Sequence, residues 1–312
     1  MEPFGQEKRR ILVTGATGNQ GAAVIKALVA LGAANIEILA LTRNTASLAA
    51  QELASLSPFI KLHKGDFSDC SAIFSNAPGQ IYGVYSVQTD QYGSPESIAQ
   101  GEIQGRAMIE AALTAGVKVF VQASGDRGGT ENSDVNPTSV PQFITKFIVE
   151  NHLKRRVAET NGRMTFTILR PSSFMENCGS DLHGQGFSTM WNCMGRPLQF
   201  ISTIDVGILG ARALLEANSP DFRNKAISLA GDELTFAEAA KIFKDLRGKS
   251  MPKSPAIIGT LVKWTQPEIK SMFLWFENVG FKADIAECKR IHPGLLDFAS
   301  WLKQTDRYGK RS

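Results

Sequence analysis

The stretch VTGATGNQGAAV, residues 13–24, places Gly15, Gly18 and Gly21 between an apolar run and a run with helical spacing. The apolar run before the glycines is short and β-branched, which is typical of a strand. Glycine permits the tight turn that joins such a strand to a helix, and it lets the helix pack closely on the strand. The stretch therefore predicts the first strand, turn and helix of a βαβ unit.

Outward from this unit, short β-rich runs alternate with helical patterns as far as Arg170. Such alternation predicts a parallel sheet, and strands that are apolar on both faces suit a sheet covered by helices on each side. We therefore expect an α/β fold with a doubly wound parallel sheet of the Rossmann type. The six predicted strands are RILVTG, EILALT, FIKLHKG, QIYGVYSVQ, KVFVQAS and MTFTILR.

The second half of the chain departs from this alternation. Residues 172–197 are rich in Ser, Gly, Asn and Met, and GRPLQFISTIDVGILGARALLEA with KAISLAG predicts a return to the sheet. From Thr235 onward the pattern is helical, including AIIGTLVKWT at residues 256–265. We expect two domains: a Rossmann domain of residues 8–170 and 198–231, and a smaller, mainly helical substrate lobe of residues 171–197 and 232–304.

The composition, with 43% hydrophobic and 21% charged residues and a net charge of +4, is typical of a folded soluble protein. Basic residues are scattered apart from short clusters such as residues 154–156, so we expect no direct nucleic-acid binding. Four cysteines without a CxxC pair fit a reducing compartment, and no run approaches the roughly 18 apolar residues of a membrane helix. We expect a soluble cytoplasmic protein, with the nucleus left open, without membrane association or a metal site.

The glycine turn lies where this kind of fold binds a pyrophosphate. Gly18 lets backbone N–H groups approach phosphate oxygens, and the helix that follows supplies about half a positive charge at its first turn. The alternative is that the glycines serve the tight turn alone.

Two later strand ends bear on the same ligand. The second strand ends LALTRN, so Arg43 stands where an acidic residue would bind the ribose 2′-hydroxyl of NAD. A guanidinium suits the 2′-phosphate of NADP(H), although arginine after a strand is also common as solvated surface. The third strand closes with KGDFSD, where Asp66 and Phe67 bracket the adenine, or Asp66 or Ser68 caps the next helix. We expect NADP(H) as the cofactor.

The segment VPQFITKFIVENHLKRR, residues 140–156, predicts a helix whose apolar stripe carries Lys146. Glu150 lies one turn later, but an exposed pair with it contributes only about 0.3 kcal/mol, so pairing explains the lysine poorly. Gln142 lies one turn before Lys146, and an amide cannot act as a general acid at neutral pH.

Seven segments occur in a characteristic order along the chain: VTGATGNQG, TRN, GDFSD, KFIVENHLK, LRPSSFMEN, KAISLAGDELTFAEAAKIF and MFLWFENVGFKADI. Together they resemble the NmrA-like family of atypical short-chain dehydrogenase/reductases, from about Arg10 to Leu302. The FMEN and LAGDELT pieces are far more specific than the glycine motif. The resemblance implies an NAD(P)-binding Rossmann domain and a smaller helical lobe that closes a cleft beside the nicotinamide.

Carried over by position, the resemblance implies cofactor contacts at Gly15, Ala16, Thr17, Gly18, Asn19, Gln20, Gly21, Arg43, Asp66, Phe67, Val87, Gln88, Thr89, Arg106, Lys146, Phe174, Met175, Glu176 and Asn177. Arg106 stands where relatives have a basic residue that reaches phosphate, and an ordinary exposed arginine is the equal alternative. Ordinary short-chain dehydrogenases carry Tyr-x-x-x-Lys on the corresponding helix, so the resemblance implies that Gln142 stands at the tyrosine position. Lys146 is expected to hold the nicotinamide ribose or to be the catalytic proton donor.

The family includes NADPH-dependent reductases of phenolic, quinone or isoflavone-type substrates, and non-catalytic sensors that regulate a protein partner. We expect an NADPH-dependent oxidoreductase acting on a small carbonyl, enone or quinone-like compound, with the sensor as the alternative. Lys146 can donate the proton if burial lowers its pKa toward the working pH. Other candidate donors are Tyr85, Tyr92, Ser124 and His183, each of which also has a structural interpretation.

Aromatic and sulfur-bearing side chains gather in the predicted small lobe. If several face the cleft, the substrate is a flat apolar molecule; otherwise they form the core between helices. The residues concerned are Phe174, Met175, Met190, Trp191, Met194, Met272, Phe273, Trp275 and Phe276. Cys178 and Cys193 lie near this segment, where they are either redox-sensitive or buried spacers.

Overall fold

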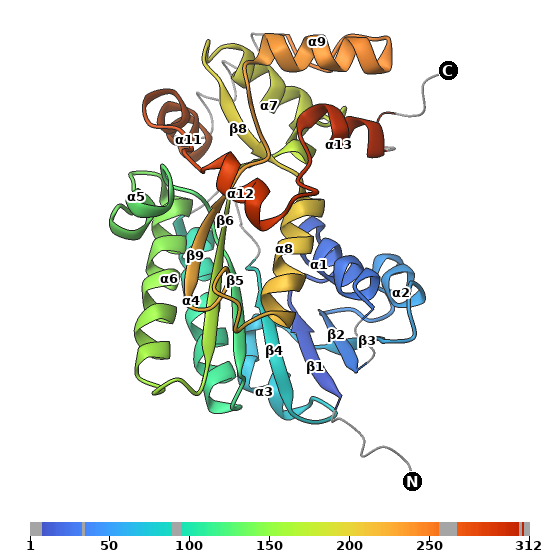
Figure 1. Ribbon diagram of the computed structural model, residues 1–312, viewed down its shortest axis with the longest axis vertical. Coiled ribbons are helices and arrows are strands. Elements are labelled where there is room, and N and C mark those ends of the chain that lie inside the picture. The colour runs from blue at the N-terminus through green and yellow to red at the C-terminus, as the bar shows by residue number, and fades with distance from the viewer. Residues whose placement is uncertain (1–7, 33–34, 89–94, 256–266, 306–307, 309–312) are drawn as a thin grey trace. The chain divides into compact units, whose positions relative to one another are not determined.

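The computed structural model of the protein describes residues 8–32, 35–88, 95–255, 267–305 and 308 (Figure 1). The chain divides into two compact units. Unit 1 comprises Met1–Ser124, Ile148–Leu169 and Val206–Ile227, and unit 2 comprises Gly125–Phe147, Arg170–Asp205 and Ser228–Ser312. Thr89, Tyr92 and the helix expected at residues 256–265 lie outside the described residues. The domain ranges expected from the sequence stay a prediction.

The main sheet has seven strands in the order β3-β2-β1-β4-β5-β6-β9. Neighbours from β3 to β6 pair in parallel, which is the order of a Rossmann sheet. The doubly wound α/β prediction and all six predicted strands are therefore confirmed. The strands are β1 (Arg9–Val13), β2 (Ile36–Thr42), β3 (Ile60–Lys64), β4 (Ile81–Ser86), β5 (Val119–Ala123), β6 (Thr165–Pro171) and β9 (Lys225–Leu229).

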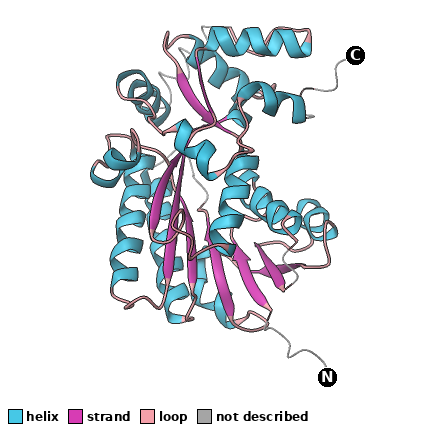
Figure 2. Cartoon of the chain, in the orientation of Figure 1, coloured by secondary structure: helices cyan, strands magenta, loops and turns pink. Residues whose placement is uncertain are grey.

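Helices cover both faces of this sheet, as Figure 2 shows. Successive side chains of a strand point to opposite faces, so neighbours on β4 identify the two layers. Val84 lies in one core with residues of α3 (Cys70–Ser75), α4 (Pro95–Thr114) and α6 (Pro141–Ala158). Tyr85 lies instead against Gly210 of α8 (Thr203–Leu215), which also packs on α1 (Asn19–Ala30). The remaining helical segments of unit 1 are α2 (Leu48–Ser55) and the 3-10 turn η1 (Phe67–Asp69).

Unit 2 contains a three-stranded sheet in the order β10-β8-β7. Its strands are β7 (Ser173–Phe174), β8 (Leu198–Ile201) and β10 (Asp232–Leu234). Its helical segments are α5 (Thr130–Val135), η2 (Met175–Asn177), α7 (Leu182–Asn192), α9 (Phe236–Arg247), α11 (Pro267–Asn278), α12 (Ile285–Ile291) and α13 (Phe298–Gln304). The prediction that KAISLAG returns to the main sheet is confirmed by β9, but the same prediction for PLQFI is wrong because β8 pairs with β7 and β10.

The core of unit 2 is aromatic. Trp191 packs on Phe187 and Phe200 with ring centroids 6.4 and 4.6 Å apart, and Trp275 lies 5.0 Å from Phe143. Of the two interpretations of the aromatic and sulfur-bearing residues, the core interpretation is confirmed for those that are buried. These are Met175, Met190, Trp191, Phe273, Trp275 and Phe276. Phe174, Met194 and Met272 are only partly buried. In the described ranges, no helix has both the length and the apolar character needed to cross a membrane.

Candidate functional site

The glycine loop of unit 1 is shaped by close approaches that exclude side chains. Gly15 has a φ of 56°, and a Cβ there would lie 2.8 Å from Cγ1 of Val87. A Cβ on Gly21 would lie 2.3 Å from the carbonyl oxygen of Gly15, and one on Gly18 would lie 3.3 Å from the same oxygen. The Gly15 oxygen also accepts a 2.9 Å hydrogen bond from the Gly18 N–H. The loop therefore needs glycine for its backbone conformation and for its contact with α1.

The amino terminus of α1 follows this loop directly. Gly18 is the N-cap, and no side chain caps the helix. The N–H groups of a first turn have no partner within the helix, and together they carry a partial positive charge. Thr17 and Asn19 are exposed around this end, whereas Ala16 is buried. The geometry is that of an anion site.

The end of β4 is fastened beside the same loop. The Thr14 hydroxyl donates to the Val87 carbonyl at 3.0 Å, and the Val87 N–H donates back to the hydroxyl oxygen at 2.8 Å. Gln88 extends the contact, because its side-chain Nε2 donates to the Ser86 hydroxyl at 2.7 Å. Val87 and Gln88, both predicted contacts, are therefore held at the carboxyl edge of the sheet.

Gln122 is a residue that the sequence argument missed. It lies on β5 with only 2% of its surface exposed, and its Nε2 donates to Oε1 of Gln88 at 2.8 Å and to the Ala123 carbonyl at 2.7 Å. In the described part of the chain its Oε1 has no hydrogen-bond partner. Its position in KVFVQAS, at the carboxyl end of a predicted strand, is the signal that could have identified it.

Arg43 and Asp66 follow β2 and β3. Arg43 is exposed, and Asp66 accepts a 2.7 Å hydrogen bond from the Ser68 N–H. Hydrogen bonds from the Ser68 hydroxyl and N–H lower the pKa of Asp66, and Arg43 adds a smaller effect of the same sign. The N-cap interpretation of Asp66 is confirmed, and a contact of Asp66 or of the partly exposed Phe67 with adenine stays a prediction.

Arg106 lies on α4 and pairs with a neighbour on the same helix. Its Nη1 lies 2.9 Å from Oε1 of Glu102, and 46% of the Arg106 side chain is exposed. This is an exposed i,i+4 pair of the kind that contributes a few tenths of a kcal/mol. A phosphate contact for Arg106 stays a prediction.

Two of the alternative proton donors have partners in unit 1. The Tyr85 hydroxyl donates to Oε1 of Gln20 at 3.3 Å, and full burial raises the pKa of Tyr85. The Ser124 hydroxyl donates to the carboxylate of Glu150, which is 1% exposed. Both side chains therefore have structural partners. His183 is exposed near the start of α7.

Lys146 lies on α6, in the part of that helix that belongs to unit 2. The lysine is half-buried, and its stem lies beside Gly125, where an added Cβ would be 3.6 Å from Cδ of Lys146. The same Cβ would lie 3.7 Å from the ring of Phe143. Gly125 follows β5, so the lysine stem packs on the loop that leaves the carboxyl end of that strand.

Gln142 lies one turn before Lys146 and is only 7% exposed. In the described residues neither its Nε2 nor its Oε1 has a hydrogen-bond partner. A buried amide without partners is costly, at about 1–3 kcal/mol for each group. The residue at the tyrosine position is thus a buried donor and acceptor that the protein's own side chains and backbone leave unsatisfied.

The FMEN segment is divided between core and surface of unit 2. Met175 is fully buried, whereas Phe174 and Asn177 are partly exposed. The Glu176 carboxylate accepts hydrogen bonds from the Thr203 hydroxyl at 2.7 Å, the Thr203 N–H at 3.1 Å and Nε1 of Trp301 at 3.2 Å. Burial raises the pKa of Glu176, and these hydrogen bonds oppose the shift. This carboxylate caps α8, and a cofactor contact for any of the four residues stays a prediction.

Asp126 anchors the loop after β5 and was also missed by the sequence argument. It is fully buried, and its carboxylate accepts from the N–H groups of Gly129 at 2.9 Å and Lys282 at 3.0 Å. Gly128 and Gly129 have φ values of 99° and 92°, which favour glycine. The loop that supports the Lys146 stem is therefore fixed to a distant segment of unit 2.

The four cysteines differ in their exposure to solvent. Cys193 is exposed, and the other three cysteines are buried. Burial raises the pKa of Cys70 to about 11. The spacer interpretation is confirmed for Cys178, which is 0% exposed.

Among the described residues, no group of three or more His, Cys, Asp and Glu side chains is arranged to hold a metal ion.

Known proteins resemble this chain in sequence and in fold. The NmrA-like family domain-containing oxidoreductase malD of Malbranchea aurantiaca is 31% identical over 172 residues, which cover 54% of this chain and 48% of malD. The chain thus spans about half the length of the curated relatives it matches.

Two solved structures share the fold at low sequence identity. The NADP(H) complex of Citrobacter sp. triphenylmethane reductase has a TM-score of 0.70 at 18% identity, and covers 95% of this chain and 99% of its own. NmrA, a negative transcriptional regulator solved in complex with NAD, has a TM-score of 0.68 at 17% identity, and covers 96% of both chains. At these identities the likeness establishes the fold alone.

The family assignment rests on a broader comparison. A model of the NmrA-like family matches residues 7–302, which is nearly the whole chain. The match includes the glycine loop, the Lys146 helix and the FMEN segment described above. The chain therefore belongs to the NmrA-like family.

Proposed function

We propose that the protein is an NADPH-dependent oxidoreductase that reduces a small carbonyl, enone or quinone-like compound. The observation that carries this proposal is the glycine loop with the uncapped start of α1. It is a cradle that Cβ atoms at Gly15 and Gly21 would fill, and it presents first-turn N–H groups to an anion. The fold of triphenylmethane reductase and the relatives named as oxidoreductases support the same class.

The choice of NADP(H) over NAD(H) rests on Arg43. The residue is exposed after β2, where the first βαβ unit reads the ribose 2′ position. In the described residues no ion pair or hydrogen bond involves its side chain. A guanidinium can bind a 2′-phosphate through two parallel charge-assisted hydrogen bonds, whereas it gains less from a 2′-hydroxyl.

The chemical step needs a hydride and a proton. NADPH, when bound, supplies the hydride. Lys146 is proposed to hold the ribose hydroxyls through its ammonium group and to give the proton to the substrate oxygen, while the loop at Gly125 supports its stem. Gln142 cannot donate a proton at neutral pH, but its unpartnered amide can hydrogen-bond the substrate oxygen and orient it.

Gln142 also favours a second candidate function, a dinucleotide sensor. Without the tyrosine of Tyr-x-x-x-Lys, the chain keeps binding groups and lacks the usual acid. The solved NmrA regulator shows that this fold exists in a negative transcriptional regulator. In that case NADP(H) occupancy would shift a conformational equilibrium that a protein partner reads.

Turnover separates the two functions. Purified protein is titrated with NADPH, and then NADPH oxidation is followed by absorbance with a panel of quinones, enones and aldehydes. The oxidoreductase proposal predicts consumption of NADPH with at least one member of the panel. Tight NADPH binding without oxidation by any of them would refute it and favour the sensor.

The role of Lys146 has its own test. If the lysine gives the proton, Lys146→Met lowers kcat by more than the loss of NADPH affinity explains, whereas a purely binding lysine loses both in step. Lys26→Met, on the exposed side of α1, is the control for removal of a positive charge. Equal loss in the two variants would remove Lys146 from the mechanism.

A further inference from the structure

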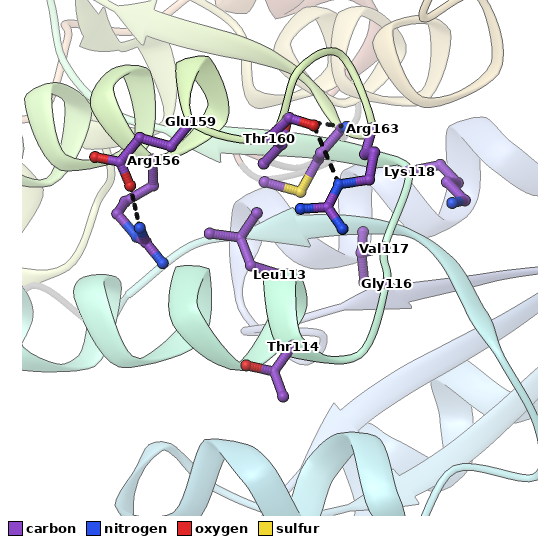
Figure 3. A pocket seen from close by; sticks show the side chains of 10 residues that line it. Leu113, Thr114, Gly116, Val117, Lys118, Arg156, Glu159, Thr160 and Arg163 are labelled. Atoms are coloured by element: carbon purple, nitrogen blue, oxygen red, sulfur yellow. Dashed lines mark hydrogen bonds and ion pairs between the residues drawn. The ribbon is translucent and has the colours of Figure 1, made fainter.

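A cavity of about 470 Å³ lies in unit 1, at the edge of the main sheet where strands begin (Figure 3). Val117 and Lys118 immediately precede β5, and Met164 immediately precedes β6. Val87 and Gln88 follow the end of the parallel neighbour β4, so they lie at the opposite edge of the sheet. The cavity is therefore separate from the glycine loop, and the proposed function does not use it.

The floor of this cavity, the buried part of its lining, is mainly apolar, with Thr160 as its polar member. Met164 is 1% exposed and Val117 is 2% exposed, and Leu113, at the end of α4, is partly exposed beside them. The volume falls within the range of roughly 300–1,000 Å³ that small-molecule sites occupy. The floor can therefore receive the compact apolar body of a ligand.

The rim is positively charged. Lys118, Arg156 and Arg163 line the cavity against one carboxylate, Glu159. Arg156 is already paired, since it contacts Glu159 and lies 2.8 Å from Glu110. Arg163 and Lys118 remain after this pairing, and both side chains are exposed.

These two cations have no counter-ion in the described part of the chain. Arg163 donates through Nε to the Thr160 carbonyl at 3.1 Å, which fixes the guanidinium and leaves its terminal nitrogens without a protein partner (Figure 3). The Lys118 side chain forms no hydrogen bond or ion pair there. Lys154 and Arg155, from the basic cluster noted in the sequence, precede Arg156 on α6 and add to the positive potential.

We propose that this cavity binds a small organic anion, with a carboxylate or phosphate group at Arg163 and Lys118 and a compact apolar body on Met164, Val117 and Leu113. A guanidinium fixed by one hydrogen bond needs little further ordering to form a fork with a carboxylate or a phosphate. The apolar floor adds affinity that an inorganic ion cannot use. A ligand with both features fits better than either feature alone.

The probes are benzoate, phenyl phosphate, inorganic phosphate and the neutral benzamide, titrated into the full chain by calorimetry and by chemical-shift changes. We expect benzoate or phenyl phosphate to bind, inorganic phosphate to bind more weakly and benzamide to fail. Preference between the first two tells a carboxylate ligand from a phosphate ligand. Arg163→Ala should weaken binding roughly 10- to 100-fold, as loss of a charged hydrogen-bonding group does.

Arg155→Ala is the matched control, because Arg155 is an exposed arginine of α6, the helix that precedes Arg163, and it does not line the cavity. Lys118→Ala provides a second lining variant, and NADPH affinity should not change in any of the three. Equal binding of benzamide, equal losses in Arg163→Ala and Arg155→Ala, or no binding of either organic anion would overturn the proposal. Binding of an acidic peptide while both small anions fail would overturn it in favour of a protein surface.

Discussion

Replacing Gln142 by methionine should stabilise the protein. The side chain is 7% exposed, and in the described residues its amide nitrogen and oxygen both lack partners. Each such group costs about 1–3 kcal/mol, and methionine has nearly the same length and helix propensity without the polar atoms. Counting one group in full gives a gain of about 1–3 kcal/mol. For a domain of about 150–250 residues, each kcal/mol raises Tm by roughly 2–4 °C.

The same substitution should weaken catalysis, because the amide is proposed to orient the substrate oxygen. Loss of one net hydrogen bond of about 0.5–1.5 kcal/mol lowers kcat/KM by roughly 2- to 13-fold. Urea unfolding of the protein without ligands measures the first effect, and NADPH oxidation measures the second. NADPH affinity should stay unchanged. A gain in stability together with a loss of substrate recognition distinguishes a ligand-binding amide from a structural one.

Gln199 supplies the matched control. It is also buried in unit 2, at 6% exposure, but its amide is satisfied: Nε2 donates to the Ala283 carbonyl at 3.1 Å and Oε1 accepts from the Ala283 N–H at 2.9 Å. Gln199→Met should therefore destabilise by about 1–3 kcal/mol. If Gln142→Met destabilises as Gln199→Met does, the reasoning is refuted. Unchanged kcat/KM in a stabilised Gln142→Met would refute the substrate contact alone.

Three further measurements address other features of the chain. Arg43→Ala should reduce the preference for NADPH over NADH roughly 10- to 100-fold, because a charged hydrogen-bonding group is lost. Lys61→Ala removes an exposed charge on β3 and should leave this preference unchanged. An unchanged preference in Arg43→Ala would contradict the 2′-phosphate contact. Burial raises the pKa of Glu176 above 4.5, so the folded state holds this proton more tightly, and the stability from Glu176 is lost as pH rises through its folded pKa. Glu176→Gln should thus gain stability relative to wild type as pH rises above 4.5 in urea unfolding, and a constant difference would contradict the shift. Iodoacetamide should label Cys193 before the buried cysteines, such as Cys70, and mass spectrometry showing the reverse order would contradict their burial.

The main sheet was predictable because its signals are local. The inner strands of the sheet, such as β4 and β5, are short apolar runs bounded by turn residues, and a parallel sheet buries such strands on both faces. The turn of the glycine loop was predictable for the same reason, since Gly18 and Gly21 approach Gly15 within the loop, whereas the approach of Val87 to Gly15 joins distant segments of the chain. Asp66 left two interpretations open in the sequence, and the short-range hydrogen bond from Ser68 identifies it as a cap.

The partners of polar and aromatic residues were less predictable. The PLQFI segment has the composition of a main-sheet strand, but β8 pairs with β10 some thirty residues later, so its sheet depends on a contact that no local pattern encodes. Trp275 and Phe273 suit a substrate pocket or a core equally well in the sequence. The structure places both in the core, because α7 and β8 supply the rings they pack against.

By itself, the sequence determined a Rossmann-type fold and membership of a family, because glycine spacing and strand alternation are local patterns and the order of the motifs can be read directly along the chain. The tertiary structure alone decided which polar groups are already satisfied. The Glu176 carboxylate accepts hydrogen bonds from Thr203 and Trp301. The Gln142 amide is buried and has no hydrogen-bond partner among the described residues. Burial and hydrogen bonding depend on segments far apart in the chain, so a residue type at a motif position does not reveal whether its side chain is left for a ligand.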